Sequence, residues 1–354
     1  MARILAEARA RSPEHPGRKV TWLELFFDLI FVAAVAQVAA PLRHHYAIAE
    51  LARLAPMLAL VWWAWTGHTF FSTRFDTDDG IQRGLTFVQI FAVAVMAANA
   101  KDALDSRSSA GFAAAYAAVR LVLVAQYLRV RHVPDARPLT RRYVAGHGIA
   151  AALWLVSALV PAPVRFWMWS AAFAIDLGTP WLAVAHSVKV PPDAAHVPER
   201  FGLFTLILLG ESVVAVMQGM ESQENWPLAA ALSAILGMAV PFLICWWYFD
   251  RTAGSEQRVR SPRDVIRFHI WSYAHFPLYF GIVVLGVGIQ RIVTAASHNA
   301  VSPSELLILV GAVTAVVVAM TAISATTCPS RSMVHLHSQP TSRPLTGTNQ
   351  EELA

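Results

Sequence analysis

The stretch "WLELFFDLIFVAAVAQVAA" (residues 22–40) decides the fold of this chain, because it is long and apolar enough to cross a lipid bilayer as a helix. A spanning helix needs about 20 mainly apolar residues. Two carboxylates, Glu24 and Asp28, interrupt the run four residues apart. That spacing puts both on one face of a helix. We therefore expect this face to turn away from lipid, toward other helices.

The whole chain has the composition of a membrane protein. Of its 354 residues, 56% are hydrophobic and 14% are charged, whereas a soluble domain has about 25% charged residues. Strand-type alternation of apolar and polar residues is absent, which argues against a β-barrel. We predict an all-α, polytopic integral membrane protein with about ten transmembrane helices. The expected spans are residues 20–40, 52–71, 84–100, 110–128, 144–161, 164–187, 201–219, 228–249, 266–290 and 305–324.

The basic residues predict the orientation of these spans. Residues 1–19 are polar and carry five Lys or Arg residues, and the apolar run that follows them is too long for a signal peptide and lacks a small-residue cleavage site. Residues 1–19 therefore read as a cytoplasmic N-terminus. With the N-terminus inside, the cytoplasmic ends of the spans hold 21 of the 28 Lys and Arg residues, the outer ends hold six, and Arg120 lies within a span. This positive-inside bias places both termini in the cytoplasm. The net charge of +5 is explained by loops facing anionic lipid, and no nucleic-acid partner is expected.

The sequence divides into three parts. The basic N-terminus is followed by a transmembrane helical domain at 20–324, and residues 325–354 are rich in Ser, Thr and Pro without apolar periodicity. Such a composition predicts a disordered polar tail. Its His-x-His at 335–337 lacks further fixed ligands, and the two cysteines have no near partner. We expect no metal site, no disulfide and no cofactor.

Ionisable residues inside the expected spans are the candidates for function. Each one costs about 2.5–3.5 kcal/mol at a helix centre, so each requires a partner or a role. Arg120 needs a carboxylate, which Asp28, Asp176 or Glu211 could supply equally well. Asp176 also precedes Pro180 by four residues, so its carbonyl loses its helical donor. The polar or ion-handling candidates are Glu24, Asp28, Arg120, Asp176, Glu211 and His275. They act on protons or cations, or they only lock helices together.

A loop and a sequence repeat add further hypotheses. The loop "RFDTDDGIQR" (74–83) groups Asp76, Asp78 and Asp79, but it lacks the later glutamate of a calcium loop. Asp79 is instead expected to cap the next helix. Trp pairs at 62–63 and 246–247, each followed by Phe-Asp near a helix end, suggest that the first two spans and the seventh and eighth are parallel repeats.

Four stretches carry a family resemblance: "VTWLELFFDLIFVAAVAQVA" (20–39), "HTFFSTRFDTDDGIQR" (68–83), "ERFGLFTLILLGESVVAV" (199–216) and "WSYAHFPLYFGIVVLGVGI" (271–289). In order, they resemble the signatures of the bacterial low temperature requirement A (LtrA) family. The resemblance implies a polytopic bacterial inner-membrane protein, and it supplies no mechanism. The family's recurrent polar positions would fall on Glu24, Asp28, the loop residues Arg74, Asp76, Asp78 and Asp79, the interface pair Glu199 and Arg200, Glu211 and His275.

This chain also departs from the family pattern. Relatives tend to continue with further apolar helices, whereas this sequence turns polar after residue 324, so a truncation or frameshift is a further hypothesis. A fainter similarity links Phe-Phe-Asp at 26–28 to the Phe-Ser-Asp signature of potassium channels built from parallel six-helix repeats.

Three functions remain open at this level. The favoured one is a proton- or cation-coupled transporter in which Asp28, Asp176 and Glu211 titrate in turn. The alternatives are a cation channel, and a membrane-embedded enzyme or stress-response scaffold that uses Glu24, Asp28 and His275 as acid–base groups. The expected partners are the lipid bilayer and a small solute or cation, and the sequence predicts no oligomeric state.

Overall fold

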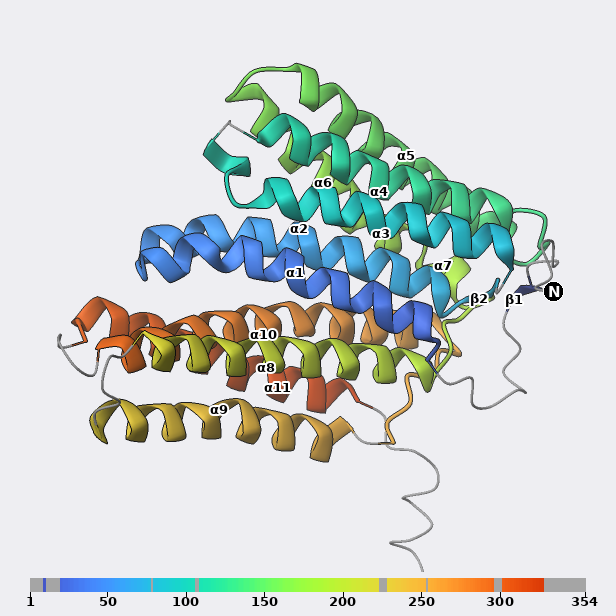
Figure 1. Ribbon diagram of the computed structural model, residues 1–354. Coiled ribbons are helices and arrows are strands. Elements are labelled where there is room, and N and C mark those ends of the chain that lie inside the picture. The colour runs from blue at the N-terminus through green and yellow to red at the C-terminus, as the bar shows by residue number, and fades with distance from the viewer. Residues whose placement is uncertain are drawn as a thin grey trace, which may run out of the picture.

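The computed structural model describes residues 9–10, 20–77, 79–105, 108–222, 228–252, 254–295 and 301–327. Long helices make up nearly all of this part of the chain (Figure 1). They are α1 (Trp22–His44), α2 (Ile48–Ser72), α3 (Gly80–Ala100), α4 (Ser109–Arg129), α5 (Arg137–Leu159), α6 (Val164–Leu182), α7 (Val184–Ser187), α8 (His196–Glu221), α9 (Leu228–Thr252), α10 (Pro262–Ala295) and α11 (Pro303–Thr326). A short 3-10 helix (Ala103–Asp105) precedes α4, and β1 (Arg9–Ala10) pairs antiparallel with β2 (Phe75–Asp76).

Nine helices within the described ranges are long and apolar enough to cross a membrane. This confirms the prediction of an all-α polytopic membrane protein. The remaining expected span, α6, is helical but is not among those nine. The α6–α7 segment still runs from end to end of the bundle. At one end, Arg165 in the first turn of α6 hydrogen-bonds to Ser109 at the start of α4. At the other end, beyond α7, the Asp193 backbone donates to the Thr73 carbonyl at the end of α2 (2.9 Å).

The helices form two packed groups with α1 and α2 at the boundary between them (Figure 1). In the first group α1 packs on α2 and α3, and α3 on α4; in the second, α8 packs on α9 and α10, and α10 on α11. α1 and α8 run in the same direction, since Asp28 contacts Arg200 near their N-terminal ends and Arg43 contacts Glu211 further along both. This parallel arrangement agrees with the suggested repeat.

Side-chain caps fix two helix starts that matter for the site. Thr21 accepts a hydrogen bond from the backbone of Glu24, and the Glu24 carboxylate accepts one in return from Thr21 (2.9 Å), which makes a capping box for α1. Asp79 accepts from the Gln82 backbone (2.7 Å) and caps α3, as the sequence predicted. Glu24 therefore has a structural role at the start of α1 in addition to its charge.

Some predicted features lie outside the described residues. These are Asp78, the side chain of Asp76, Cys328, the His-x-His at 335–337 and most of the two terminal segments. At the C-terminal end the structure differs slightly from the prediction, because α11 continues through residue 326, two residues into the expected tail.

The α10–α11 contact depends on a glycine. A Cβ built on Gly281 would lie 2.9 Å from the Ala312 carbonyl oxygen and 3.3 Å from the Val316 backbone nitrogen. Those atoms belong to the facing helix backbone and cannot move aside independently. Helices in membranes rely on such small residues to approach closely.

Gly281→Ala is therefore expected to destabilise the protein by about 1–3 kcal/mol, the usual cost of overpacking a tight contact. The measurement is the unfolding midpoint of purified protein in mixed detergent micelles. Gly311→Ala on α11 is the matched control, because a Cβ there meets nothing within 4 Å. Equal midpoints for the two variants would contradict the prediction.

Candidate functional site

A buried ionic cluster with an excess of acid lies between α1 and α8, and we call it the Arg200 cluster: Glu24, Asp28, Trp65, His196 and Arg200. Asp28 and Arg200 are both fully buried, and Arg200 Nη2 donates to Asp28 Oδ1 at 2.6 Å. The indole nitrogen of Trp65 donates to the same oxygen at 2.7 Å. The other carboxylate oxygen of Asp28 has no hydrogen-bond partner in the described part of the chain.

Glu24 extends this cluster toward one end of the bundle. Its Oε1 lies 3.4 Å from Arg200 Nη1 and 3.4 Å from His196 Nε2. His196 is itself buried, and its Nδ1 hydrogen-bonds with Glu199 at 3.1 Å. The Glu199 side chain is 46% exposed. A chain of ionisable groups thus leads from the surface at Glu199, through His196 and Glu24, to Asp28.

The predicted interface pair, Glu199 and Arg200, contacts two different partners. Helix α8 begins at His196, five residues before the predicted span, so Arg200 lies a full turn inside the helix and faces α1. Glu199 faces His196 instead. Arg200 is consequently a buried ion-pair partner of Asp28.

Glu24 also borders a small cavity of about 50 Å³ between the first three helices. Most of the residues that line it are of polar types. The lining residues are Thr21, Leu23, Glu24, His68, Ser72, Phe75, Thr77, Gln82, Arg83 and Thr86. His68, buried beside it, stacks on Phe27 at 3.9 Å between ring centroids and hydrogen-bonds with Gln89 at 2.9 Å. This cavity is large enough for one or two water molecules.

A second cluster joins α4, α5 and α6, and it identifies the partner of Arg120. Arg120 Nε lies 2.6 Å from Asp176 Oδ2, and Arg120 Nη2 donates to the Tyr116 hydroxyl at 2.6 Å. His147 Nδ1 hydrogen-bonds with the other Asp176 oxygen at 2.6 Å. All four side chains are buried. We call this set the Arg120 cluster; it contains one acid and one arginine, so its formal charges balance.

The remaining predicted site residues lie elsewhere. Glu211 pairs with Arg43, and both side chains are about one-fifth exposed. His275 is fully buried among aromatic rings and hydrogen-bonds with Tyr248 (3.1 Å) and the Trp271 carbonyl (2.8 Å). Asp28, Asp176 and Glu211 thus sit in three separate ion pairs, so the hypothesis that they titrate in turn around one cavity is not supported by the geometry.

The predicted loop contributes one ion pair and one buried cation. Asp79 Oδ2 accepts a hydrogen bond from Arg129 Nη2 at 2.6 Å. Arg74 is fully buried and does not contact the Arg200 or Arg120 clusters through any hydrogen bond or ion pair. No group of three His, Cys, Asp or Glu residues in the described ranges is placed to hold a metal ion.

Comparisons with known proteins identify the family of this chain. The family described as Bacterial low temperature requirement A protein (LtrA) has a model that matches residues 19–339. The chain belongs to the LtrA family. An uncharacterized protein of Rhizobium meliloti (strain 1021) is similar to it, with 26% identity over 284 residues, which cover 76% of this chain and 68% of that protein. No solved structure matches the chain. The family membership establishes the protein class and leaves its activity open.

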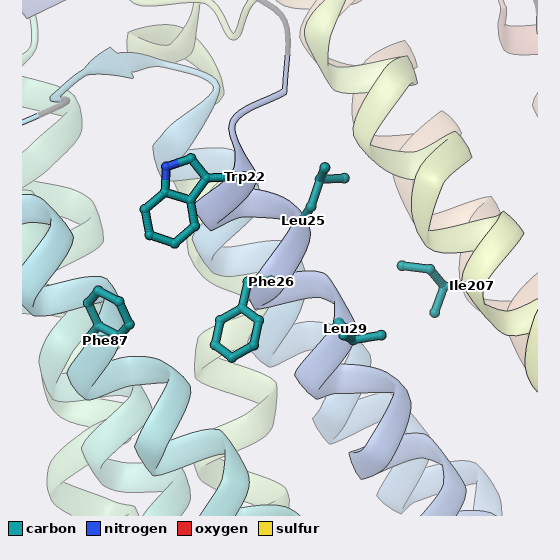
Figure 2. A pocket seen from close by; sticks show the side chains of 6 residues that line it. All are labelled: Trp22, Leu25, Phe26, Leu29, Phe87 and Ile207. Carbon is teal, nitrogen blue, oxygen red and sulfur yellow. The ribbon is translucent and has the colours of Figure 1, made fainter.

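The LtrA signature in α1 has two faces with different surroundings. Glu24 and Asp28 point into the protein, whereas the opposite face is apolar and borders a groove of about 660 Å³ (Figure 2). The groove is lined by Trp22, Leu25, Phe26, Leu29, Phe87 and Ile207. The prediction that the acidic face turns inward is thus met, and the aromatic residues on the other face are those that would meet lipid tails.

Two members of the Arg200 cluster were missed by sequence reasoning. His196 falls in a segment predicted as a loop, and Trp65 is one of several tryptophans in an apolar run. A helical reading from His196 onward would have placed His196 and Arg200 four residues apart on one face. Nothing in the sequence distinguishes Trp65 from its neighbours Trp62 and Trp63.

Proposed function

We propose that this LtrA-family protein is a proton-coupled transporter of the bacterial inner membrane and that the Arg200 cluster is its proton-binding site. Both termini would lie in the cytoplasm, with residues 20–324 as a single transmembrane domain between the N-terminal 1–19 segment and a disordered 325–354 tail. The observation that carries the proposal is the charge count at the cluster: two buried carboxylates, Glu24 and Asp28, face one guanidinium.

This excess of acid distinguishes the Arg200 cluster from the ion pairs of Asp176 and Glu211, the other two acids that the sequence proposed as titrating groups. Arg120 with Asp176 and Arg43 with Glu211 each balance formally. Burying an uncompensated charge is expensive, so an excess carboxylate is stabilised when it takes up a proton. The unpartnered oxygen of Asp28, and His196 beside Glu24, offer two places for that proton.

The same geometry favours a proton over a metal cation. Arg200 occupies the space between the two carboxylates, which is where a cation would have to bind to neutralise both. Glu199 and His196 connect the cluster to the surface through hydrogen bonds, as a proton path requires. The channel alternative, in which acids of α1 line an ion pore, therefore receives less support.

The position of the cluster connects proton binding to movement. It bridges α1 and α8, the first helices of the two groups, and parallel repeats place coupling sites at such interfaces. Loss of the proton leaves a net negative charge between the two helices and weakens their contact. A solute that binds one arrangement more tightly than the other then couples its movement to that of the proton.

The test is solute-driven proton flux in liposomes that contain the purified protein and an internal pH-sensitive dye. The probes are panels of amino acids, carboxylates, sugars, and sodium and potassium salts. We expect at least one panel member to drive flux, and Asp28→Asn to reduce the rate by about tenfold or more, as loss of an essential proton carrier does. Asp105→Asn is the control, because Asp105 is half exposed and pairs with Arg53 at the surface. No flux with any probe in wild-type protein would overturn the proposal.

A further inference from the structure

Arg74 is a buried cation without an acidic partner in the part of the chain that the structure describes. It follows α2, and none of its side chain is exposed. Its Nη1 donates to the Phe70 carbonyl at 3.3 Å, and its guanidinium lies over the rings of Phe70 (5.4 Å) and Tyr143 (5.7 Å). Its Nε and Nη2 have no hydrogen-bond partner. A guanidinium in this state leaves both charge and donors unsatisfied, which is costly in a buried site.

Two tyrosine hydroxyls gather beside this guanidinium. Tyr127 from α4 and Tyr143 from α5 lie with their ring centroids 4.8 Å apart. The positive charge of Arg74 interacts electrostatically with both hydroxyls. Both hydroxyls are buried, and neither makes a hydrogen bond of good geometry. His269 of α10, also fully buried, is within reach of the Arg74 charge, and both of its ring nitrogens are unpartnered. The site thus collects O–H and N–H groups around one positive charge.

The unengaged atoms of Arg74 specify the chemistry of a ligand. Nε and Nη2 form one edge of the planar guanidinium, and this edge binds a carboxylate through two parallel hydrogen bonds. Nη1, which contacts the Phe70 carbonyl, lies away from that edge. A tyrosine hydroxyl donates readily to a carboxylate oxygen. We propose that Arg74, Tyr127 and Tyr143 bind a small monocarboxylate, whose single negative charge neutralises the guanidinium.

The neighbouring charges do not neutralise Arg74. The Arg120 cluster approaches the two tyrosines through His147, whose ring centroid is 6.2 Å from that of Tyr127 and 5.5 Å from that of Tyr143. His147 is hydrogen-bonded to Asp176, and Asp176 is already paired with Arg120. The positive charge of Arg74 is therefore left for a ligand.

A basic cleft on the surface lies at the same ends of α4 and α5. It has a volume of about 590 Å³ and lies at the α4–α5 connection. Its wall includes exposed Arg131, His132, Arg137 and Arg141, together with Leu128 and Val144. Leu128 and Val144 directly follow Tyr127 and Tyr143 in sequence, so the cleft and the buried hydroxyls share the same two helix ends. Asp135 is the single acid in residues 128–144. A concave basic surface of this kind concentrates anions.

The test is binding of radiolabelled acetate to the purified full chain by a scintillation proximity assay, at constant ionic strength. We expect saturable binding that formate and propionate displace and that chloride and phosphate do not. Arg74→Lys, which keeps the charge and removes the two-bond edge, is expected to weaken binding by about tenfold, which corresponds to roughly 1.4 kcal/mol. Arg129→Lys is the matched control at the same end of the bundle, because Arg129 pairs with Asp79.

A second variant covers the case in which Arg74→Lys lowers the yield of folded protein. The double variant Tyr127→Phe, Tyr143→Phe keeps both rings and removes only the hydroxyls, and it is expected to weaken acetate binding severalfold. Wild-type protein without saturable acetate binding, displacement by chloride as readily as by formate, or unchanged binding in the folded double variant would each overturn the inference. The inference does not rest on the proposed transport, and Asp28→Asn should bind acetate as the wild type does.

Discussion

Replacing Arg120 by methionine is expected to lower the free energy of unfolding by about 3–5 kcal/mol, the usual cost of removing one partner from a buried ion pair. Arg120 and Asp176 are both fully buried, and their charged atoms lie 2.6 Å apart. The substitution leaves the Asp176 carboxylate with His147 as its remaining hydrogen-bonding partner in the part of the chain that the structure describes. The measurement is unfolding of the purified protein in mixed detergent micelles, followed by circular dichroism.

The pair should matter far less when both charges are removed. Arg120→Met combined with Asp176→Leu is expected to recover most of the lost stability, because replacing a buried ion pair by apolar side chains is often nearly neutral. Arg53→Met provides the control, since Arg53 and Asp105 form an exposed pair and surface pairs contribute about 0–1 kcal/mol. A double variant that is no more stable than Arg120→Met alone would contradict the ion-pair explanation.

The sequence was sufficient for the helices and for the inward face of α1. Apolar runs of spanning length stand out against their polar flanks, and the four-residue spacing of Glu24 and Asp28 determines that they share a face. Both side chains are buried, while Trp22, Leu25, Phe26 and Leu29 lie on the outer side. These features depend on residues close together in the chain, where helix geometry alone is decisive.

The pairing of charges could not be predicted in the same way. The sequence offered three acids as equally plausible partners for Arg120. Its contact with Asp176 depends on how α4, α5 and α6 pack on one another. Arg200 was expected at the membrane interface, because the apolar run begins at residue 201. The helix starts five residues earlier, and its packing on α1 buries Arg200 against Asp28. Contacts between distant segments, and helix starts within polar sequence, are difficult to predict from the sequence alone.

Replacing Arg200 by methionine is expected to lower the free energy of unfolding by about 3–5 kcal/mol near pH 8, where both acids tend to ionise. Glu24 and Asp28 would then repel each other in a buried site where, among the described residues, His196, Thr21 and Trp65 remain as partners. Protonation of the carboxylates removes this repulsion. The loss relative to wild type should therefore shrink as the pH falls to about 5, because the folded variant takes up protons that relieve its buried charge.

The same measurement separates the charge of Arg200 from its packing. Asp28→Asn in the Arg200→Met background removes one of the two acids and is expected to restore part of the stability lost near pH 8. Arg251→Met is the control, because Arg251 and Asp250 form an exposed pair at the end of α9. A loss that is equal at both pH values, with no recovery in the double variant, would assign the effect to lost packing between α1 and α8. A loss that diminishes with acid, and a partial recovery, would instead identify the excess negative charge as the property that Arg200 controls.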